Sequence, residues 1–268
     1  MKWSKRLQTI MEEVPAGSVM ADIGTDHAYL PIRLQKEGIC PHVILCDVSS
    51  GSLKKAENDW KEEIPDTEPD LRLGDGLQLL KAGEAGSIVM AGIGGILIAD
   101  ILEYNLEKAR TFPRFILQPR SNPGYLRWRL DCCGFQIMRE HIAPEGRRLC
   151  EILVVSPLSD ETKNTPGTGN QQGDSPAEKM PGLQAFQSLS PEVQAEYMYP
   201  DRLISSAYAQ KYLRKQFQKQ ENILKNQRKS QNADTGDTEA LRRRLKFLLE
   251  KQEQLTERGN KQEKSVMP

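Results

Sequence analysis

The chain has 268 residues, enough for one large domain with an appendage or for two domains. Its 37 Lys and Arg balance 37 Asp and Glu, so net charge alone does not indicate a nucleic-acid partner. No apolar run is long enough to cross a bilayer, which excludes a transmembrane helix. The five cysteines are an odd number and lie outside metal-ligand spacing, so we expect reduced thiols, a cytoplasmic protein and no metal site.

Helices and strands alternate along the first half of the chain. Ser4 can cap a first helix that ends before Pro15. Apolar runs predict strands at 19–23, 42–48, 70–73, 87–91 and 114–118, and helices are predicted at 28–37, from 49 past 60, from 96 to 106 and at 125–133. Extended runs at 135–142 and 149–155 predict a closing hairpin. The result is an α/β fold with a seven-stranded, mostly parallel Rossmann-like sheet, typical of class I methyltransferases.

The composition changes after Pro157. We interpret residues 1–158 as the catalytic domain and residues 159–199, which begin with a stretch rich in Ser, Thr, Pro and Gly, as a flexible linker. Residues 200–258 predict an antiparallel coiled-coil hairpin, and residues 259–268 a disordered tail. The apolar positions that fit the heptads are Leu213, Phe217, Leu224, Leu241, Leu245, Leu248 and Leu255.

The turn after the first strand is unusual for a nucleotide-binding fold. A phosphate-binding turn would carry glycine at the positions of Gly24, Asp26 and Ala28, and here the second is an acid. A carboxylate at Asp26 would repel a pyrophosphate but would suit a cationic cofactor, so S-adenosylmethionine fits better than NAD, FAD or ATP. The alternative is that Asp26 merely caps the next helix.

Acids and glycines follow each of the first four strands, where ligands bind in open parallel sheets. Asp47 is placed to accept from ribose hydroxyls and Asp75 from an adenine amino group, although each acid alone could be a turn residue. The predicted cofactor-binding residues are Asp22, Gly24, Asp26, Asp47, Gly74, Asp75, Gly76, Ala91 and Gly92.

The end of the fourth strand indicates the acceptor. Residues 91–95 contain no amide or acid that could hold an exocyclic amine, and Gly94 and Gly95 either leave room for a flat base or simply allow a tight turn. A ring nitrogen needs alignment and a nearby negative charge rather than deprotonation. We therefore predict catalytic roles for Asp26, His27 and Tyr29, with a supporting role for His27 left open.

These motifs resemble the bacterial tRNA (adenine-22-N1)-methyltransferase family. The resemblance covers residues 1 to about 155, and its most specific part is the run from Asp26 to Pro31. It implies S-adenosylmethionine as methyl donor, N1 of an adenine in the D-arm region of tRNA as acceptor, and a C-terminal coiled coil that helps to hold tRNA. After Gln118-Pro119 the family often shows Asn, whereas here Arg120 comes first and Asn122 follows later.

Basic residues would supply the RNA contacts. The predicted substrate-binding residues are Lys5, Arg6, Gly94, Gly95, Gln118, Arg120 and Asn122, with further basic residues at Arg127, Arg129, Lys211, Arg214, Lys215, Lys219 and Arg242 to Arg244. We expect tRNA as partner, no membrane, and a monomer or weak dimer. The alternatives are a methyltransferase of this fold acting on a small molecule and a non-catalytic RNA-binding protein.

Overall fold

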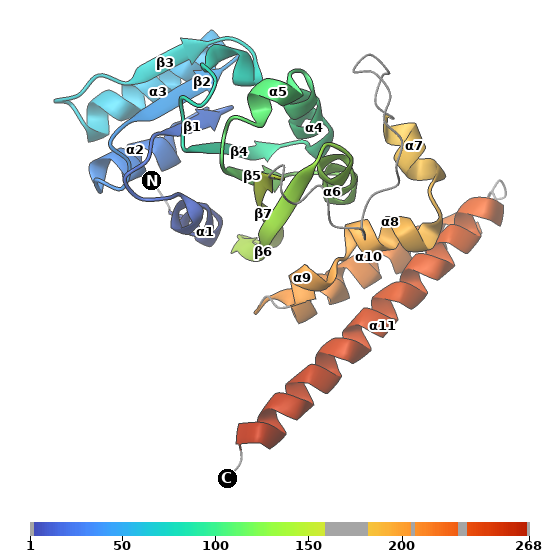
Figure 1. Ribbon diagram of the computed structural model, residues 1–268. Coiled ribbons are helices and arrows are strands. Elements are labelled where there is room, and N and C mark those ends of the chain that lie inside the picture. The colour runs from blue at the N-terminus through green and yellow to red at the C-terminus, as the bar shows by residue number, and fades with distance from the viewer. Residues whose placement is uncertain (1–2, 159–181, 205–206, 230–234, 267–268) are drawn as a thin grey trace.

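The computed structural model describes residues 3–158, 182–204, 207–229 and 235–266. A seven-stranded sheet with helices on both faces forms the N-terminal part, and a group of helices ending in one long helix lies beside it (Figure 1). The strands are β1 (Met20–Ile23), β2 (Val43–Asp47), β3 (Asp70–Leu73), β4 (Ser87–Ile93), β5 (Phe115–Pro119), β6 (Phe135–Glu145) and β7 (Arg148–Pro157).

The strand order is β3-β2-β1-β4-β5-β7-β6. Strands β1 to β5 pair in parallel, and β7 runs antiparallel to both β5 and β6. The predicted fold class is therefore confirmed. After β3 the chain returns to place β4 beside β1, so the strand order switches between these two strands. Ligands of open α/β sheets bind at such a switch, outside the carboxyl ends of the strands.

Alternation of apolar side chains along the central strands separates two cores. Ala21 and Ile23 face one core, and Met20 faces the other. The helices packed around the first core are α4 (Gly95–Glu103), α5 (Leu106–Ala109) and α6 (Pro123–Cys132), together with the 3₁₀ turn η1 (Gly76–Leu79). The second core lies under α1 (Lys5–Glu13), α2 (Tyr29–Lys36) and α3 (Ser50–Glu63).

Two of these helices begin where the sequence predicted, because serine side chains satisfy their first amides. The Ser4 hydroxyl accepts from the Leu7 amide at 3.2 Å, and the Ser49 hydroxyl accepts from the Ser52 amide at 3.2 Å. The single helix predicted from 96 to 106 is instead divided into α4 and α5, since the Asn105 side chain caps a new turn by accepting from the Lys108 amide.

The C-terminal part differs from the expected linker. Within residues 182–199 the chain forms α7 (Leu183–Ser188) and α8 (Pro191–Met198), where we expected no regular structure. The reason is packing: the ring of Phe186 contacts Tyr125 and Trp128 of α6, and Tyr199 is buried. The first part of that linker, residues 159–181, lies outside the described residues.

Three more helices complete the chain: α9 (Asp201–Ile204), α10 (Ala209–Lys229) and α11 (Thr235–Val266). Leu213 and Leu224 of α10 and Leu241 and Leu248 of α11 are buried, and α10 packs along α11. Knobs-into-holes packing of a coiled coil stays a prediction. The helix α11 continues to Val266, so helix occupies most of the segment predicted to be a disordered tail.

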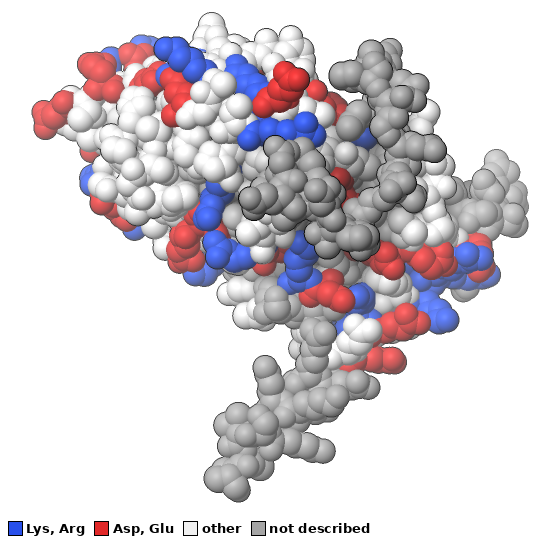
Figure 2. All heavy atoms as spheres, viewed as in Figure 1, with Lys and Arg blue, Asp and Glu red and all other residues white. Residues whose placement is uncertain are grey.

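The C-terminal helices join the sheet through the β6–β7 hairpin. Ile142 and Leu149 of the hairpin share an apolar cluster with Tyr199, Tyr212 and Leu248. In the part of the chain that is described, no helix combines the length and apolar character needed to span a membrane. On the face drawn in Figure 2, basic and acidic side chains are interspersed, in keeping with the zero net charge.

Candidate active site

The loop between β1 and α2 is held in an uncommon backbone conformation. Gly24, Asp26 and Ala28 all have positive φ, at 82°, 42° and 52°. Such angles are costly for the two non-glycine residues and are typical of functional loops. Ala28 occupies the N-cap position of α2 and no side chain caps that helix, so the interpretation of Asp26 as a helix cap is wrong. Its side chain is 59% exposed, and its carboxylate lies 3.2 Å from the Lys55 ammonium.

Asp22 lies buried directly before this loop. Its carboxylate accepts from the Thr25 hydroxyl at 2.8 Å. Burial raises the pKa of the Asp22 carboxyl from 3.8 to about 6, against the opposing effect of the Thr25 hydrogen bond. A cation placed beside this buried carboxylate would stabilise its charged form.

His27 and Tyr29 form a stacked pair beside Asp26. Their ring centroids lie 5.1 Å apart and the rings are nearly parallel, at 14°. The Nδ1 atom of His27 lies 2.8 Å from a carboxylate oxygen of Asp59 on α3. Asp59 therefore holds the imidazole in place, and the His27 and Tyr29 rings both line the cavity. Asp59 was missed because nothing distinguishes it in sequence from any other acid on a solvent-facing helix.

The residues that follow the ends of β2 and β3 do not line this cavity. The Asp47 carboxylate accepts from the Ser49 amide at 2.8 Å, and the neighbouring Val48 is 68% exposed. Gly74, at a φ of 154°, donates its amide to the Asp47 carbonyl. Asp75 and Gly76 line a separate hollow of about 260 Å³. Of the predicted cofactor residues, Asp75 and Gly76 thus line this hollow, Asp47 and Gly74 line neither space, and the others line the main cavity.

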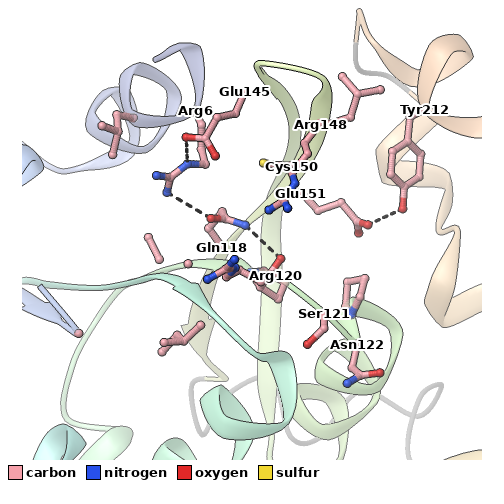
Figure 3. Close-up of a pocket in the computed structure, with 18 of the residues that line it drawn as sticks. Arg6, Gln118, Arg120, Ser121, Asn122, Glu145, Arg148, Cys150, Glu151 and Tyr212 are labelled. Carbon is pink, nitrogen blue, oxygen red and sulfur yellow. Dashed lines mark hydrogen bonds and ion pairs between the residues drawn. The ribbon is translucent and has the colours of Figure 1, made fainter. Parts of the chain in front are cut away.

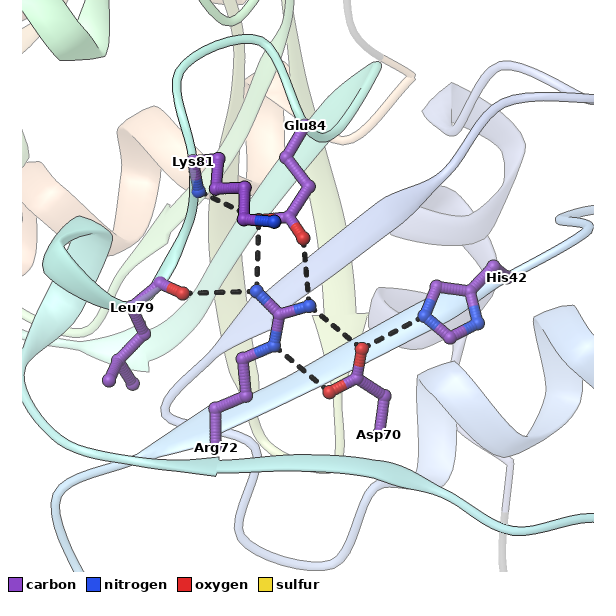
Figure 4. Close-up of polar contacts among 6 residues, drawn as sticks. All are labelled: His42, Asp70, Arg72, Leu79, Lys81 and Glu84. Atoms are coloured by element: carbon purple, nitrogen blue, oxygen red, sulfur yellow. Dashed lines mark hydrogen bonds and ion pairs between the residues drawn. The ribbon is translucent and has the colours of Figure 1, made fainter.

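A network of charged side chains fixes the segment that carries Asp75 (Figure 4). Arg72 binds Asp70 through two nitrogens, at 2.9 and 2.8 Å, and Glu84 through two, at 2.9 and 2.8 Å. Arg72 also donates to the Leu79 carbonyl at 3.0 Å, and His42 Nε2 lies 2.9 Å from Asp70. The Arg72 hydrogen bonds hold the pKa of the Glu84 carboxyl near 2. Arg72, on the edge strand β3, therefore holds two points of the segment between β3 and β4, at Leu79 and at Glu84.

The glycines at the end of β4 and the start of α4 have two different surroundings. Ala91 and Gly92 line the main cavity, and a Cβ added to Gly92 would meet nothing within 4 Å. At Gly95, an added Cβ would lie 2.6 Å from the Asn122 carbonyl oxygen and 2.8 Å from that of Ser121. Gly94 likewise packs under Ser121. The expectation that Gly94 and Gly95 leave room for a base is wrong, because the loop after β5 fills that space.

The main cavity has a volume of about 890 Å³ and begins at the switch between β1 and β4 (Figure 3). Gln118 is buried at the end of β5. Arg6 donates to its side-chain oxygen at 3.2 Å and binds Glu145 at 2.6 Å, while the Gln118 amide nitrogen donates to the Pro119 carbonyl at 3.0 Å. Arg6, Gln118, Arg120 and Asn122 therefore all line the cavity. Lys5 does not, and its ammonium lies 3.8 Å from Glu12.

Two arginines expected to contact RNA are buried instead. Arg127 binds Glu140 at 3.0 Å and Glu151 at 2.6 Å, and donates to the Tyr197 carbonyl. Arg129 binds Glu103 at 2.5 Å. The expectation is wrong for both because α6 is covered on one side by the sheet and on the other by α8, so that its charged positions face protein.

The sequence did not reveal that the C-terminal helices form one wall of the cavity. The Tyr212 hydroxyl of α10 donates to the Glu151 carboxylate of β7. Lys215 and Lys219, one and two turns further along α10, line the cavity together with Arg147 and Arg148 of the β6–β7 turn. These contacts join residues about 60 positions apart, and no local pattern encodes them.

A family model described as "Methyltransferase domain" matches residues 3–153, more than half of the chain. The chain belongs to this methyltransferase family. Over 154 residues it is 38% identical to the tRNA (adenine(22)-N(1))-methyltransferase of Bacillus subtilis. That alignment covers 58% of this chain and 65% of the relative, so it spans less than two thirds of the relative's length.

Solved structures extend the similarity to the helical part. The B. subtilis M1A22 tRNA methyltransferase TrmK matches with a TM-score of 0.67 and 30% identity, over 96% of this chain and 98% of that one. A Streptococcus pneumoniae structure in complex with S-adenosyl-L-methionine matches with a TM-score of 0.71 and 26% identity, over 94% and 100% of the chains. The resemblance to the tRNA (adenine-22-N1)-methyltransferases is confirmed.

The residues of this chain fit S-adenosylmethionine in charge and in space. Carboxylates at Asp22 and Asp26 suit its ammonium and sulfonium groups, and positive φ at Gly24 and open space over Gly92 let a ligand approach the backbone. Asp47 and the exposed Val48 offer an acceptor and an apolar surface for an adenosine. Among the described residues, no cluster of His, Cys, Asp and Glu is arranged to bind a metal.

Proposed function

We propose that this protein transfers the methyl group of S-adenosyl-L-methionine to N1 of adenine 22 in tRNA. The observation that supports this best is the composition of one continuous cavity. It begins at acidic residues at the switch point of the sheet and ends between basic residues of the β6–β7 turn and α10. The acidic end suits a cationic donor, and the basic end suits a phosphate backbone.

The proposed mechanism relies on positioning and electrostatics. The bound cofactor supplies an electrophilic methyl group on a sulfonium. The N1 lone pair of the base is nucleophilic without deprotonation, so no general base is needed. The charge instead moves from sulfur to the base, which becomes cationic. Asp26 is positioned to stabilise that positive charge, and it is fixed by its strained backbone rather than by a helix cap.

Aromatic and amide groups orient the base in this proposal. Tyr29, stacked on His27, offers an aromatic surface for the purine, and Asp59 holds the imidazole in place. Gln118, fixed by Arg6, presents an amide to the same cavity. Because N1 lies on the Watson–Crick edge, the target adenine has to be unpaired or flipped out before it enters. We infer a cytoplasmic site of action, where tRNA is present, and the oligomeric state stays a prediction.

A methylation assay tests the proposal. Purified protein, unmodified tRNA transcripts and isotope-labelled S-adenosylmethionine should yield one 1-methyladenosine, which nuclease digestion and mass spectrometry should map to position 22 of the transcript. A transcript with another nucleotide at that position is the matched control. Methylation elsewhere, or of the control transcript, would contradict the proposed acceptor.

One variant separates chemistry from cofactor binding. Asp26→Ala should lower turnover by about two orders of magnitude or more, because it removes a fixed charge opposite the developing cation. Its affinity for S-adenosylmethionine, measured by calorimetry, should change by less than about tenfold. A parallel loss of affinity would assign Asp26 to cofactor binding instead.

A further inference from the structure

The far end of the cavity has two basic sides that face each other. One side, called here the β6–β7 turn, is formed by Arg147 in the turn and Arg148 at the start of β7, both exposed. The other is the exposed face of α10, with Lys215 and Lys219 one turn apart. Arg120, after β5, lies between them in the lining of the same cavity. Figure 3 shows Arg120 and Arg148 in the cavity, with Tyr212 of α10 pointing toward Glu151 of β7.

Two contacts fix the spacing between the sides. The Lys215 ammonium donates to the Arg147 carbonyl at 2.7 Å, which bridges α10 and the turn at the surface. Deeper in the cavity, the Tyr212 hydroxyl donates to Glu151, and Glu151 also binds the buried guanidinium of Arg127. The two sides are therefore held together by contacts at two points, so their positions relative to each other are fixed by the protein.

The charge on this passage is not neutralised by the protein. The two nearby acids are already engaged, Glu145 with Arg6 and Glu151 with Arg127 and Tyr212. Within the described ranges, Arg120, Arg148 and Lys219 make no ion pair with an acid. The remaining acids of the cavity, Asp22 in β1 and Asp26 on the β1–α2 loop, lie at its opposite end. An anionic ligand is therefore favoured at one end only.

We propose that the β6–β7 turn and α10 form a phosphate clamp. Its ligand is the sugar–phosphate backbone of a nucleic-acid strand next to the methylated base. Arg147 and Arg148 contact phosphates from one side, and Lys215 and Lys219 from the other. The clamp rests on the proposed function, since it gives the strand that carries the target base its path into the cavity. Phosphate contacts fix position and register without reading sequence, so specificity for the base stays with the cavity itself.

The test compares the RNA binding of two double variants, each of which removes two positive charges. Arg147→Gln/Arg148→Gln removes one side of the clamp, and both residues are exposed, so folding should be retained. Lys36→Gln/Lys61→Gln removes the same charge at the C-terminal ends of α2 and α3, outside the cavity. Fluorescence anisotropy with a labelled tRNA transcript, at several salt concentrations, gives the affinity and its salt dependence without requiring turnover.

In the Arg147→Gln/Arg148→Gln variant, the plot of log affinity against log salt should become less steep, with its slope smaller in magnitude by about one to two. Each lost phosphate contact accounts for about 0.7 to 0.9 of that change. The turn variant's affinity for tRNA should fall at least about tenfold at low salt, and its affinity for S-adenosylmethionine should not change. The Lys36/Lys61 variant should match the wild type, and Arg147→Lys/Arg148→Lys should recover most of the binding.

Unchanged tRNA affinity and salt slope in the turn variant would overturn the clamp, as would an equal loss in the Lys36/Lys61 variant or no binding of tRNA by the wild type. These results are distinct from failure of the proposed function. A wild type that binds tRNA with the expected variant effects but methylates no adenine would retain the clamp and refute the assigned acceptor.

Discussion

The buried carboxyl of Asp22 makes a specific prediction about stability. Its pKa rises from 3.8 to about 6 because the folded protein removes it from water. The folded state therefore binds the proton more tightly than the unfolded chain does. The contribution of this acid to the free energy of unfolding is full below pH 3.8 and is lost as the pH rises to about 6. At about 1.4 kcal/mol per pH unit, the loss is about 3 kcal/mol.

Asp22→Asn removes the ionisation but keeps an oxygen that can accept from Thr25. Without cofactor, the variant should be more stable than the wild type at pH 7 by up to about 3 kcal/mol, and the difference should disappear towards pH 4. Urea unfolding at several pH values measures this directly. Asp66→Asn, which alters an exposed acid in a loop, is the control and should leave stability within about 0.5 kcal/mol of the wild type.

The same substitution should weaken binding of S-adenosylmethionine, because a positive ligand group would no longer find a negative partner. Wild-type affinity should increase from pH 5 to pH 7 as Asp22 ionises, and the variant should lack this dependence. A variant that is less stable than the wild type at pH 7, or that shows the same pH profile, would refute the argument that Asp22 is held charged at the expense of folding.

Two further substitutions test the packing around the cavity. Gly95→Ala should destabilise the protein by about 1 to 3 kcal/mol, measured by thermal unfolding, because its Cβ would meet the backbone carbonyls of Asn122 and Ser121. Gly51→Ala is the control, because Gly51 also lies in a helix without a positive φ and its added Cβ would come no closer than 3.5 Å to another atom. Arg127→Leu should cost about 3 to 5 kcal/mol in urea unfolding, since it leaves the carboxylates of Glu140 and Glu151 buried without their cation; a loss below about 1 kcal/mol would contradict the buried network.

The sequence predicted the sheet and its helices because their signals are local. Strand runs, serine caps and the hairpin turn each depend on a few neighbouring residues, so Ser4 could be identified as a cap and the start of α3 could be placed near residue 49. The acids of the β1–α2 loop and the cavity-lining Gln118 were also predicted in this way. The helices α7 and α8 were missed because their sequence is polar and their stability depends on a few rings such as Phe186 packing on distant α6.

The sequence could not predict in the same way which charged side chains are buried and which partners they bind. Arg127 and Arg129 look like surface residues in sequence, and their burial depends on Glu140, Glu151 and Glu103, which other elements supply. The role of Lys215 as a bridge to the β6–β7 turn likewise depends on a tertiary contact. Sequence periodicity reports which face of an element is apolar, whereas pairing of buried charges is settled by the assembled fold.

The guanidinium of Arg127 has a consequence for dissecting the protein by truncation. It binds β6 and β7 through their glutamates and donates to the Tyr197 carbonyl in the last turn of α8, while Glu151 also accepts from the Tyr212 hydroxyl of α10. Cutting the chain after the sheet would uncover Ile142 and Leu149 and open this ionic centre to water. An isolated N-terminal fragment should therefore be poorly soluble, and its inactivity would say little about where RNA is held. Point substitutions on the exposed face of α10 are the sounder way to separate the two halves.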